Sequence, residues 1–405
     1  MTNEKFVCPV YKKCGGCQLD VTYKQQLSYK QRTAIKMLGR YARVSEIVGM
    51  DEPLGYRCKV SSAFGFSRGH AIYGVWQSSS GRLVQVDKCA LEDVRAAKIV
   101  EAIRILLPKF MLRTYDEESG KGFLRFVTIR IGKKSGEILV ALGTGDGKFQ
   151  GKLDFAKALK ERCPEITTIV QNVSTSHLNL LLGEKESVLV GKGYITDNLC
   201  GYDFRISARS FFQINPTQTE KLYSTAVEFA SLSGNESVID AYCGVGTIGI
   251  IASKNARRVI SAEVNADAVA NAKENVEING IKNVEVICAD AGRFMQKLAK
   301  SGESIDVVFT DPPRAGCSKE FLTSLLALSP KKIVYISCNP ETLARDLYFL
   351  TKNGYKAEKI QPFDMFPYTK HIEAVVLLSR KKVNDRINFD INIEALPDRV
   401  SKTAT

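Results

Sequence analysis

The chain has 405 residues, 44% of them hydrophobic and 25% charged, a composition that indicates a folded chain of roughly two or three domains. Lysine and arginine outnumber aspartate and glutamate by 57 to 44, and residues 1–200 hold 31 basic against 20 acidic side chains. Such an excess favours a polyanionic partner, with nucleic acid the first candidate. The alternative is a basic surface that faces solvent and binds no partner. No long apolar run is present, which excludes a membrane-spanning helix.

Residues 1–20 are rich in cysteine and glycine and lack the apolar region of a signal peptide. We therefore expect a cytoplasmic protein with reduced thiols, whose grouped cysteines are metal ligands or nucleophiles and not disulfides. Cys8, Cys14 and Cys17 are close in sequence, and Cys89 is the candidate fourth ligand. Three neighbouring thiolates and one remote thiolate suit either zinc or a four-iron cluster, and the spacing alone does not distinguish them.

Residues 21–43 are predicted to form a helix with an apolar stripe that includes Leu27, Ala34 and Leu38. No acidic residue occurs between Val21 and Ser45. The basic residues of this segment are Lys24, Lys30, Arg32, Lys36, Arg40 and Arg43. Because these uncompensated cations exceed what solubility requires, we expect the helix to follow a phosphate backbone.

Residues 55–202 show mainly strand and hairpin signals, with helices predicted at 91–107 and 153–162. The predicted strands are 60–66, 71–76, 83–86, 123–131, 138–142, 167–173 and 179–182. This pattern indicates an α+β domain and does not specify the order of its strands.

Beyond Ser210, strands and helices alternate as they do in a doubly wound α/β domain with a parallel sheet. Strands are predicted at 237–242, 258–263, 284–288, 306–310, 332–337, 355–361 and 371–379, and helices at 247–253, 266–279, 291–299, 319–327 and 341–350. We therefore predict an N-terminal α+β domain at 1–205, a Rossmann-like domain at 206–380 and a polar tail at 381–405.

A glycine-rich loop follows the first strand of the Rossmann-like domain. Gly244, Gly246 and Gly249 have the G-x-G-x-x-G spacing, which lets the backbone approach a ligand and is shared by dinucleotide and S-adenosylmethionine sites. The next strand ends at Glu263, whose carboxylate can accept hydrogen bonds from ribose hydroxyls. Asp290 ends the third strand, where the adenine edge of such a ligand would lie. Ordinary strand-end solubility is the alternative for both acids.

Two further turns lie at the same predicted edge. Residues 311–314 form an Asp-Pro-Pro-Arg turn, which a dinucleotide enzyme does not require but which several nucleic-acid methyltransferases place beside the methyl donor. Residues 337–340 form a Ser-Cys-Asn-Pro turn. It places Cys338 where ligands bind and at the start of a helix, which lowers the pKa of a thiol.

A thiolate beside a methyl donor indicates chemistry at carbon 5 of uracil. Carbon 5 becomes nucleophilic once a thiolate has added to carbon 6, and a base must later remove the carbon 5 proton so that the thiolate can leave. We assign Cys338 as the nucleophile and Glu373 as the base, with His371 as the competing base.

In combination these motifs resemble those of the bacterial RNA uracil-C5-methyltransferases, which make 5-methyluridine in 23S ribosomal RNA and in transfer RNA. The resemblance extends from Cys8 to about Arg380, and the matching segments are 210–216, 240–247, 311–314, 337–340 and 371–373. It implies Cys338 as nucleophile and Glu373 as proton acceptor. It also implies that the site for S-adenosylmethionine is lined by Gln213, Tyr242, Glu263, Asp290 and Asp311, of which Gln213 rests on the resemblance alone.

The ribosomal RNA branch of this family carries a [4Fe-4S] cluster on cysteines in this arrangement. The resemblance therefore implies a cluster on Cys8, Cys14, Cys17 and Cys89, and an iron–sulfur and RNA-binding role for domain 1–205. Its implied partner is an unpaired or remodelled loop of 23S ribosomal RNA, and we expect a monomer that does not associate with membranes.

Three alternatives remain: the transfer RNA enzyme, a non-catalytic RNA-binding iron–sulfur protein, and a nicotinamide-dependent oxidoreductase. The cysteines argue against the first, because the family's transfer RNA branch lacks those ligands. Cys338 together with Glu373 argues against the second, and the turns at 311–314 and 337–340 argue against the third.

Many members of the family begin with a small β-barrel RNA-binding domain, whereas seven residues precede Cys8 here. We therefore expect RNA binding to depend on the 21–43 helix, the cysteine domain and a set of aromatic residues. These aromatic residues are Phe64, Phe66, Tyr73 and Trp76. Their rings would stack on unpaired bases, with packing in a core as the alternative.

Overall fold

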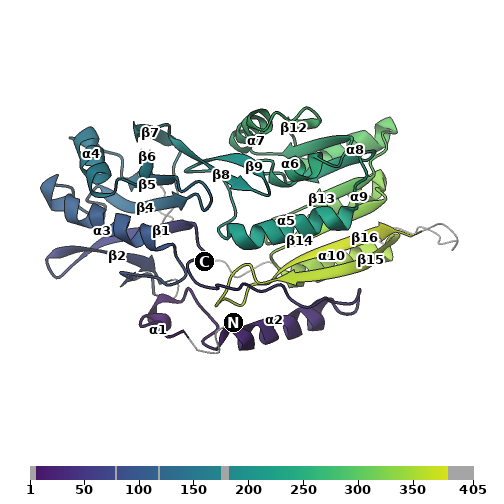
Figure 1. Cartoon of the computed structure of the whole chain (residues 1–405), viewed down its shortest axis with the longest axis horizontal. Helices are drawn as coiled ribbons and strands as arrows, with labels where there is room; N and C mark the ends of the chain where they lie inside the picture. The colour runs from purple at the N-terminus through teal and green to yellow at the C-terminus, as the bar shows by residue number, and fades with distance from the viewer. Residues whose placement is uncertain (1–5, 78–79, 117–118, 175–181, 382–405) are drawn as a thin grey trace.

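The computed structural model describes residues 6–77, 80–116, 119–174 and 182–381. They form two seven-stranded sheets and a two-stranded ribbon, placed one after another along the long axis of the molecule (Figure 1). Only Lys381 of the tail predicted at 381–405 lies within these ranges. Within the same ranges, no helix is long and apolar enough to cross a membrane.

The N-terminal half is built on a mixed sheet with the strand order β3-β2-β1-β4-β5-β6-β7. All neighbours are antiparallel except β5 and β6, which α4 connects as a parallel pair. The strands are β1 (Lys59–Ser67), β2 (His70–Trp76), β3 (Leu83–Gln85), β4 (Leu124–Ile131), β5 (Ile138–Thr144), β6 (Ile166–Val173) and β7 (Lys185–Val190), and the helices α3 (Val94–Lys109) and α4 (Lys152–Arg162) cover one face.

Six of these strands and both helices agree with the sequence-based prediction. The strand predicted at 179–182 falls outside the described residues except for Leu182, and β7 was not predicted. The strand order, which the sequence did not specify, places β4 in the middle of the sheet, where every one of its residues is buried.

An antiparallel ribbon of β8 (Tyr194–Leu199) and β9 (Tyr202–Ser207) joins the two halves. Its apolar side chains pack on the second face of the N-terminal sheet and also belong to the core of the C-terminal half. The two halves therefore share one continuous hydrophobic core, and the predicted boundary between residues 205 and 206 falls inside β9.

The C-terminal half is the predicted doubly wound α/β domain, with the strand order β12-β11-β10-β13-β14-β16-β15. The first five strands in this order are parallel, and β16 and β15 are antiparallel to their neighbours. The strands are β10 (Ser237–Ala241), β11 (Arg258–Glu263), β12 (Val284–Cys288), β13 (Val307–Thr310), β14 (Lys332–Ser337), β15 (Tyr355–Phe363) and β16 (Glu373–Arg380).

Helices cover both faces of this sheet because alternate residues of each strand point to opposite sides. Val307 and Phe309 of β13 pack toward one helix layer, and Val308 packs toward the other. The first layer contains α5 (Pro216–Ala230), α6 (Thr247–Ser253) and α7 (Ala266–Ile278), and the second contains α8 (Ala291–Ser301), α9 (Lys319–Leu328) and α10 (Pro340–Lys352).

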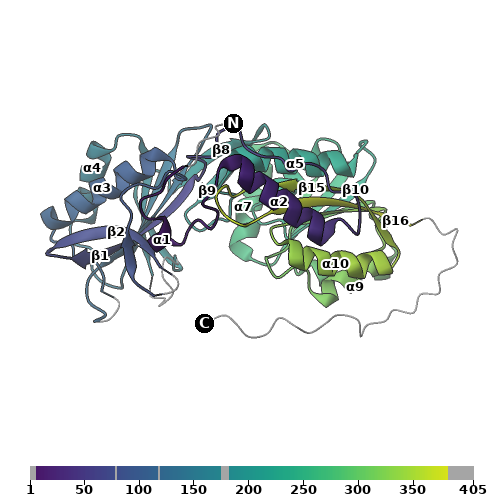
Figure 2. The ribbon, with the colours of Figure 1, turned by 90° about the horizontal axis from the view of Figure 1, so that it is seen from below.

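The N-terminal segment crosses to the C-terminal half. After the short helix α1 (Tyr11–Cys14), the chain forms α2 (Tyr23–Leu38), which starts with a capping box: the Thr22 hydroxyl accepts from the Gln25 N–H and the Gln25 side chain accepts from the Thr22 N–H. Figure 2 shows α2 lying along α10 and β15. The 21–43 helix assigned to domain 1–205 is thus part of the C-terminal fold.

The segment after α2 continues along the edge of the C-terminal sheet. Val44 bridges to Ile360 and Val48 to Phe363 in parallel fashion, and the N–H of Asp364 donates to the Val48 carbonyl at 2.9 Å. An edge strand offers unpaired backbone groups, so this pairing protects the outer edge of β15.

Lys30 corrects the expectation for the 21–43 helix. Its ammonium is fully buried and donates to Asp364 Oδ1 at 2.5 Å and to the Phe366 carbonyl at 3.0 Å. It therefore cannot contact a phosphate backbone. The other basic residues of the segment are exposed, namely Lys24, Arg32, Lys36, Arg40 and Arg43.

The aromatic residues expected to stack on RNA divide into two groups. Phe64 and Tyr73 pack in the core between the sheet and α3, so their stacking on bases is excluded in this fold. Phe66 is 70% exposed and Trp76 is half-buried. Alternation along β1 does not explain why Phe66 is exposed, because Phe64 and Phe66 share a face. Phe66 is exposed because it lies near the free end of the β1–β2 hairpin.

Replacing Lys30 with alanine leaves the Asp364 carboxylate buried without its counter-ion, so we expect a loss of roughly 3–5 kcal/mol of stability. Lys36→Ala, on the exposed face of the same helix, should change stability by less than about 0.5 kcal/mol. Calorimetric unfolding of the two variants measures the difference. Equal unfolding midpoints would mean that the ion pair does not hold α2 in place.

Candidate active site

A cavity of about 760 Å³ opens at the edge of the C-terminal sheet where β10, β11, β13 and β14 end and β16 begins. This is the edge at which doubly wound sheets bind ligands. The predicted site residues that line it are Gln213, Tyr242, Glu263, Asp311, Cys338 and Glu373. Further lining residues are Phe211, Tyr223, Thr247, Arg314, Phe366 and His371.

The loop after β10 is shaped by close packing beneath it. Gly249 has no room for a side chain, since an added Cβ would lie 2.3 Å from Ser261 Oγ, and its N–H donates to buried Asp240 Oδ2 at 2.7 Å. Tyr242 has a φ of 61° and Gly246 a φ of 85°, so the chain turns sharply before α6 starts. By contrast, an added Cβ at Gly244 would meet nothing within 4 Å, which leaves space for a ligand.

Glu263 is fixed beside this loop. Its Oε2 accepts from the Gly244 N–H at 3.0 Å and its Oε1 from the Asn265 N–H at 2.9 Å. Asp290 does not line the cavity. It is an exposed N-cap of α8 that accepts a hydrogen bond from the Arg293 N–H at 2.9 Å. Its charge nevertheless contributes to the raised pKa of the nearby Tyr242.

The antiparallel pairing of β14 with β16 brings the predicted nucleophile and base together. In this register Ser337 faces Ala374, and its continuation by one residue places Cys338 opposite Glu373. Directly opposed residues have their Cβ atoms about 5 Å apart. Asp311 follows the adjacent strand β13, so the three side chains come from neighbouring strands at one edge.

Burial and mutual repulsion govern the protonation of these groups. Glu373 is buried beside the half-buried Asp311. Burial and the charge of Asp311 raise the pKa of Glu373 well above its ordinary value, and desolvation raises the pKa of Asp311. Burial, followed by the charges of Glu373 and Asp311, raises the pKa of Cys338 to about 11. The expected lowering by the start of α10 is thus outweighed, and Cys338 is a thiol in the free protein.

Two further lining residues, Arg314 and His371, carry a guanidinium and an imidazole group. Arg314 Nη2 lies 3.4 Å from His371 Nδ1, and the Arg314 carbonyl accepts from Asn339 Nδ2 at 3.2 Å. Burial, Arg314, Lys30 and Arg57 all lower the pKa of His371. His371 is therefore neutral at pH 7. It lies next to Arg314, whereas Glu373 lies opposite Cys338.

Gln213 is placed by contacts with the N-terminal sheet. The Cys58 N–H donates to the Ile214 carbonyl at 2.9 Å, and buried Arg130 donates to the carbonyls of Ala208 and Ser210. These contacts hold the loop 208–215 over the cavity, with Phe211 70% exposed at its rim.

Sequence reasoning missed several lining residues. Tyr223 of α5 is buried among Gln213, Thr247, Asp311 and Glu373, and its burial and the two carboxylates raise its pKa. No motif marks it, because in the sequence it is one apolar position among many on an amphipathic helix. Phe366 lies in a loop without a recognisable pattern, whereas Arg314 is part of a turn that had been singled out.

The four predicted metal-ligating cysteines are half-buried at the junction of the two halves. The charges of Cys8 and Cys14 raise the pKa of Cys17, and the charge of Cys17 raises the pKa of Cys89, so the four cysteines are neighbours. Burial is the main reason why the pKa values of Cys17 and Cys89 are raised, the latter to about 11. Over residues 6–77, 80–116, 119–174 and 182–381, however, no group of three or more potential ligands is spaced to hold a metal ion. The sulfur atoms of these cysteines are suitable ligands for a metal, but the four side chains do not lie close enough together to bind one in this structure.

The cavity combines an open glycine loop, a carboxylate fixed at the end of the second strand, and a nucleophile with a neighbouring acid. The loop and Glu263 fit the phosphate-free, ribose-containing donor S-adenosylmethionine, because the backbone at Gly244 is accessible and Glu263 presents a carboxylate for hydroxyl groups. When bound, this donor supplies an electrophilic methyl group. Cys338, Asp311 and Glu373 line the same cavity as the glycine loop and Glu263.

Comparison with known proteins supports this reading of the cavity. The family profile described as tRNA (uracil-5-)-methyltransferase matches residues 141–381. An uncharacterized RNA methyltransferase of Halalkalibacterium halodurans is 40% identical over 380 residues, covering 92% of this chain and 83% of that protein. A second one, of Clostridium acetobutylicum, is 41% identical over 382 residues with the same coverage.

A solved structure is also similar over most of the chain. The tRNA (uracil-54, C5)-methyltransferase of Pyrococcus abyssi, in complex with S-adenosyl-L-homocysteine, superposes with a TM-score of 0.74 and 28% identity, covering 89% of this chain and 84% of that one. The profile match and the full-length relatives show that this chain belongs to the tRNA (uracil-5-)-methyltransferase family, whose members are S-adenosylmethionine-dependent RNA methyltransferases.

Proposed function

We propose that this protein methylates carbon 5 of a uridine in 23S ribosomal RNA through a covalent bond between Cys338 Sγ and carbon 6 of the uracil. The observation that carries the proposal is the strand register that places Cys338 opposite Glu373 in a cavity that also contains the donor loop. A nucleophile and a base that face each other across one bound ring suit addition and elimination at adjacent carbons.

The residues act in a fixed order. The Cys338 thiol loses its proton to the Asp311 carboxylate, and the thiolate adds to carbon 6, which makes carbon 5 nucleophilic. After the methyl group has moved from the donor sulfur to carbon 5, the Glu373 carboxylate removes the carbon 5 proton. The carbon–sulfur bond at carbon 6 then breaks, the departing thiolate takes back the proton held by Asp311, and Glu373 releases the carbon 5 proton to solvent.

Glu373 is favoured over His371 as the base by its surroundings. Glu373 is 3% exposed and opposite the nucleophile, and its raised pKa makes its carboxylate a stronger base. The pKa of His371 is lowered, which weakens it as a base, and its Nδ1 faces Arg314.

The choice of 23S ribosomal RNA rests on the cysteine arrangement. The second candidate is transfer RNA, which the likeness to the Pyrococcus abyssi tRNA enzyme favours. Either substrate must present the uridine unstacked, because Cys338 lies in the cavity lining and a stacked base could not reach it. We propose that the protein acts as a monomer in the cytoplasm, where its many cysteines would stay reduced.

We expect substitutions of the two reacting residues to block different steps of the reaction. Cys338→Ala removes the nucleophile, so neither 5-methyluridine nor a covalent complex should form. Glu373→Gln leaves addition and methylation intact but slows removal of the carbon 5 proton, so a methylated protein–RNA adduct should accumulate. Denaturing gel electrophoresis with a radioactive methyl group measures both. An adduct that accumulates with His371→Ala instead would identify His371 as the base, and full activity of Cys338→Ala would falsify the covalent mechanism.

The RNA target can be read directly. In a strain that lacks this protein, one or more 5-methyluridines should disappear from 23S ribosomal RNA, and those of transfer RNA should remain. Mass spectrometry of nuclease fragments from the two purified RNAs measures this, with the strain carrying the wild-type gene as control. Loss of 5-methyluridine from transfer RNA alone would establish the second candidate.

We propose further that Cys8, Cys14, Cys17 and Cys89 bind a [4Fe-4S] cluster between the N-terminal segment and the loop before α3, which requires the four thiols to move closer together than they lie here. Protein purified without oxygen should then contain about four irons per chain and absorb broadly in the visible range. Cys14→Ala should lose the iron, whereas Cys163→Ala, at a buried position in the core under α4, should retain it. One zinc and no iron in the wild-type protein would contradict the assignment.

A further inference from the structure

The loop that connects β15 to β16, residues 364–372, forms one wall of the cavity and is here named the β15–β16 loop. Phe366 and His371 line the cavity, and Glu373 follows the loop directly. The Phe366 and His371 rings contact each other edge to face, with centroids 6.1 Å apart. The loop has no regular structure; within it the Thr369 N–H and hydroxyl donate to the Phe366 carbonyl at 3.2 and 2.8 Å. Tyr368 has a φ of 67°, and further contacts from outside the loop add to this turn.

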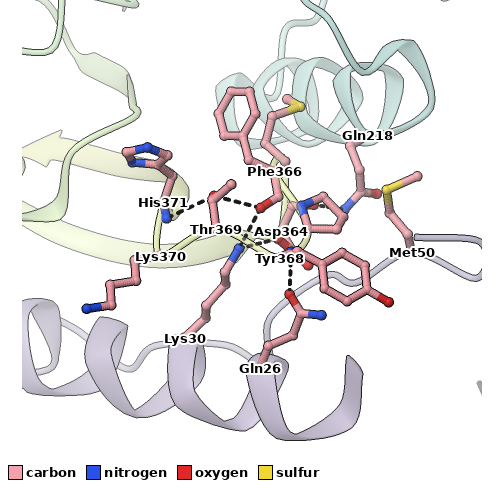
Figure 3. A network of polar contacts seen from close by, with 12 residues as sticks. Gln26, Lys30, Met50, Gln218, Asp364, Phe366, Tyr368, Thr369, Lys370 and His371 are labelled. Carbon is pink, nitrogen blue, oxygen red and sulfur yellow. Dashed lines mark hydrogen bonds and ion pairs between the residues drawn. The ribbon is translucent and has the colours of Figure 1, made fainter. Parts of the chain in front are cut away.

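Those contacts come from the N-terminal segment. Figure 3 shows Lys30 and Gln26 extending from α2 to the β15–β16 loop. Lys30 Nζ binds both Asp364 Oδ1, at 2.5 Å, and the Phe366 carbonyl, at 3.0 Å, in a site from which solvent is excluded. One turn earlier, Gln26 Oε1 accepts from the Tyr368 N–H at 2.6 Å.

The segment beside Cys17 binds the same loop. The N–H groups of Gln18 and Leu19 donate to the Tyr368 carbonyl at 3.0 and 3.1 Å. From the opposite side, Asn215 Nδ2 donates to the Met365 carbonyl at 2.8 Å. Backbone groups that would otherwise be unpaired are thus satisfied by side chains and loops far away in sequence, and each contact fixes one point of the cavity wall.

We propose that Lys30 is a positioning residue for methyl transfer, which holds the β15–β16 loop so that Phe366, His371 and Glu373 face the bound uracil. The inference rests on the proposed function. Its physical basis is the second bond of the ammonium: a buried ion pair can be replaced by packed apolar side chains without loss of stability, but such side chains cannot hold the Phe366 carbonyl.

The consequence is specific to the RNA side of the cavity. Lys30 reaches the loop that leads to Glu373, whereas the donor loop and Glu263 lie on other strands and have no contact with Lys30 among the described residues. Loss of the Lys30 bond should therefore slow the steps that involve the uracil and leave donor binding unchanged.

The test uses the double variant Lys30→Met/Asp364→Leu in the full-length protein, which replaces both charges with apolar side chains. Its unfolding midpoint and its affinity for S-adenosyl-L-homocysteine should match those of the wild-type protein. Its kcat should fall by roughly 10- to 100-fold, because small misplacements of reacting groups have effects of that size. Lys300→Met, an exposed lysine of α8, is the control and should behave as wild type.

Two single variants separate the carbonyl bond from the ion pair. Asp364→Asn and Lys30→Met both break the ion pair, but only Lys30→Met removes the bond from α2 to the Phe366 carbonyl, which then keeps only its bonds from Thr369 within the loop. Rates are expressed per molecule that binds S-adenosyl-L-homocysteine, so that a partly folded sample is still informative. The kcat of Lys30→Met should be about tenfold lower than that of Asp364→Asn. Equal kcat values, or a double variant with wild-type kcat, would show that Lys30 serves stability alone.

The two proposals fail in different ways. If the wild-type protein forms no 5-methyluridine on either RNA, the proposed function is wrong whatever the Lys30 variants do. If the wild-type protein is active and the double variant equals it in kcat, only the positioning role is wrong.

Discussion

The antiparallel insertion of β16 between β14 and β15 is the constraint on which the active site depends. Because β14 ends at the ligand edge of the sheet and β16 begins there, residues 35 positions apart in sequence, Cys338 and Glu373, become cross-strand neighbours. A sheet with a parallel strand in this place would put the start of that strand at the opposite edge. The direction of one strand therefore decides whether nucleophile and base share a cavity.

The electrostatics of the cavity follow from that arrangement. Glu373 is buried and Asp311 and Cys338 are half-buried beside it, so the charge of Asp311 raises the pKa of Glu373 and both carboxylates raise that of Cys338. Cys338 is therefore a thiol in the free protein and needs a base to become the nucleophile. Arg314 is the cation that partly offsets this effect, and it comes from the same turn as Asp311.

The N-terminal segment belongs to the catalytic half of the molecule, although it precedes the N-terminal sheet in the chain. It pairs with β15, packs α2 on α10, and bonds to the β15–β16 loop through Lys30, Gln26 and the residues next to Cys17. The cysteine segment and the cavity wall are therefore connected by direct hydrogen bonds. Gln18, next to Cys17, bonds to Tyr368, which lies three residues before His371.

Hydrophobic periodicity and turn motifs are local, so they were enough to predict the doubly wound domain, most of its strand limits and several residues that line its ligand edge. Short segments such as 337–340 were also enough to identify the family. Other features needed the tertiary structure: that Asp290 caps a helix outside the cavity, that Tyr223 and Phe366 line it, and that Lys30 is buried against Asp364 and not exposed to a phosphate backbone. These facts depend on contacts between residues up to 334 positions apart, and no local pattern specifies which distant surface a helix will cover.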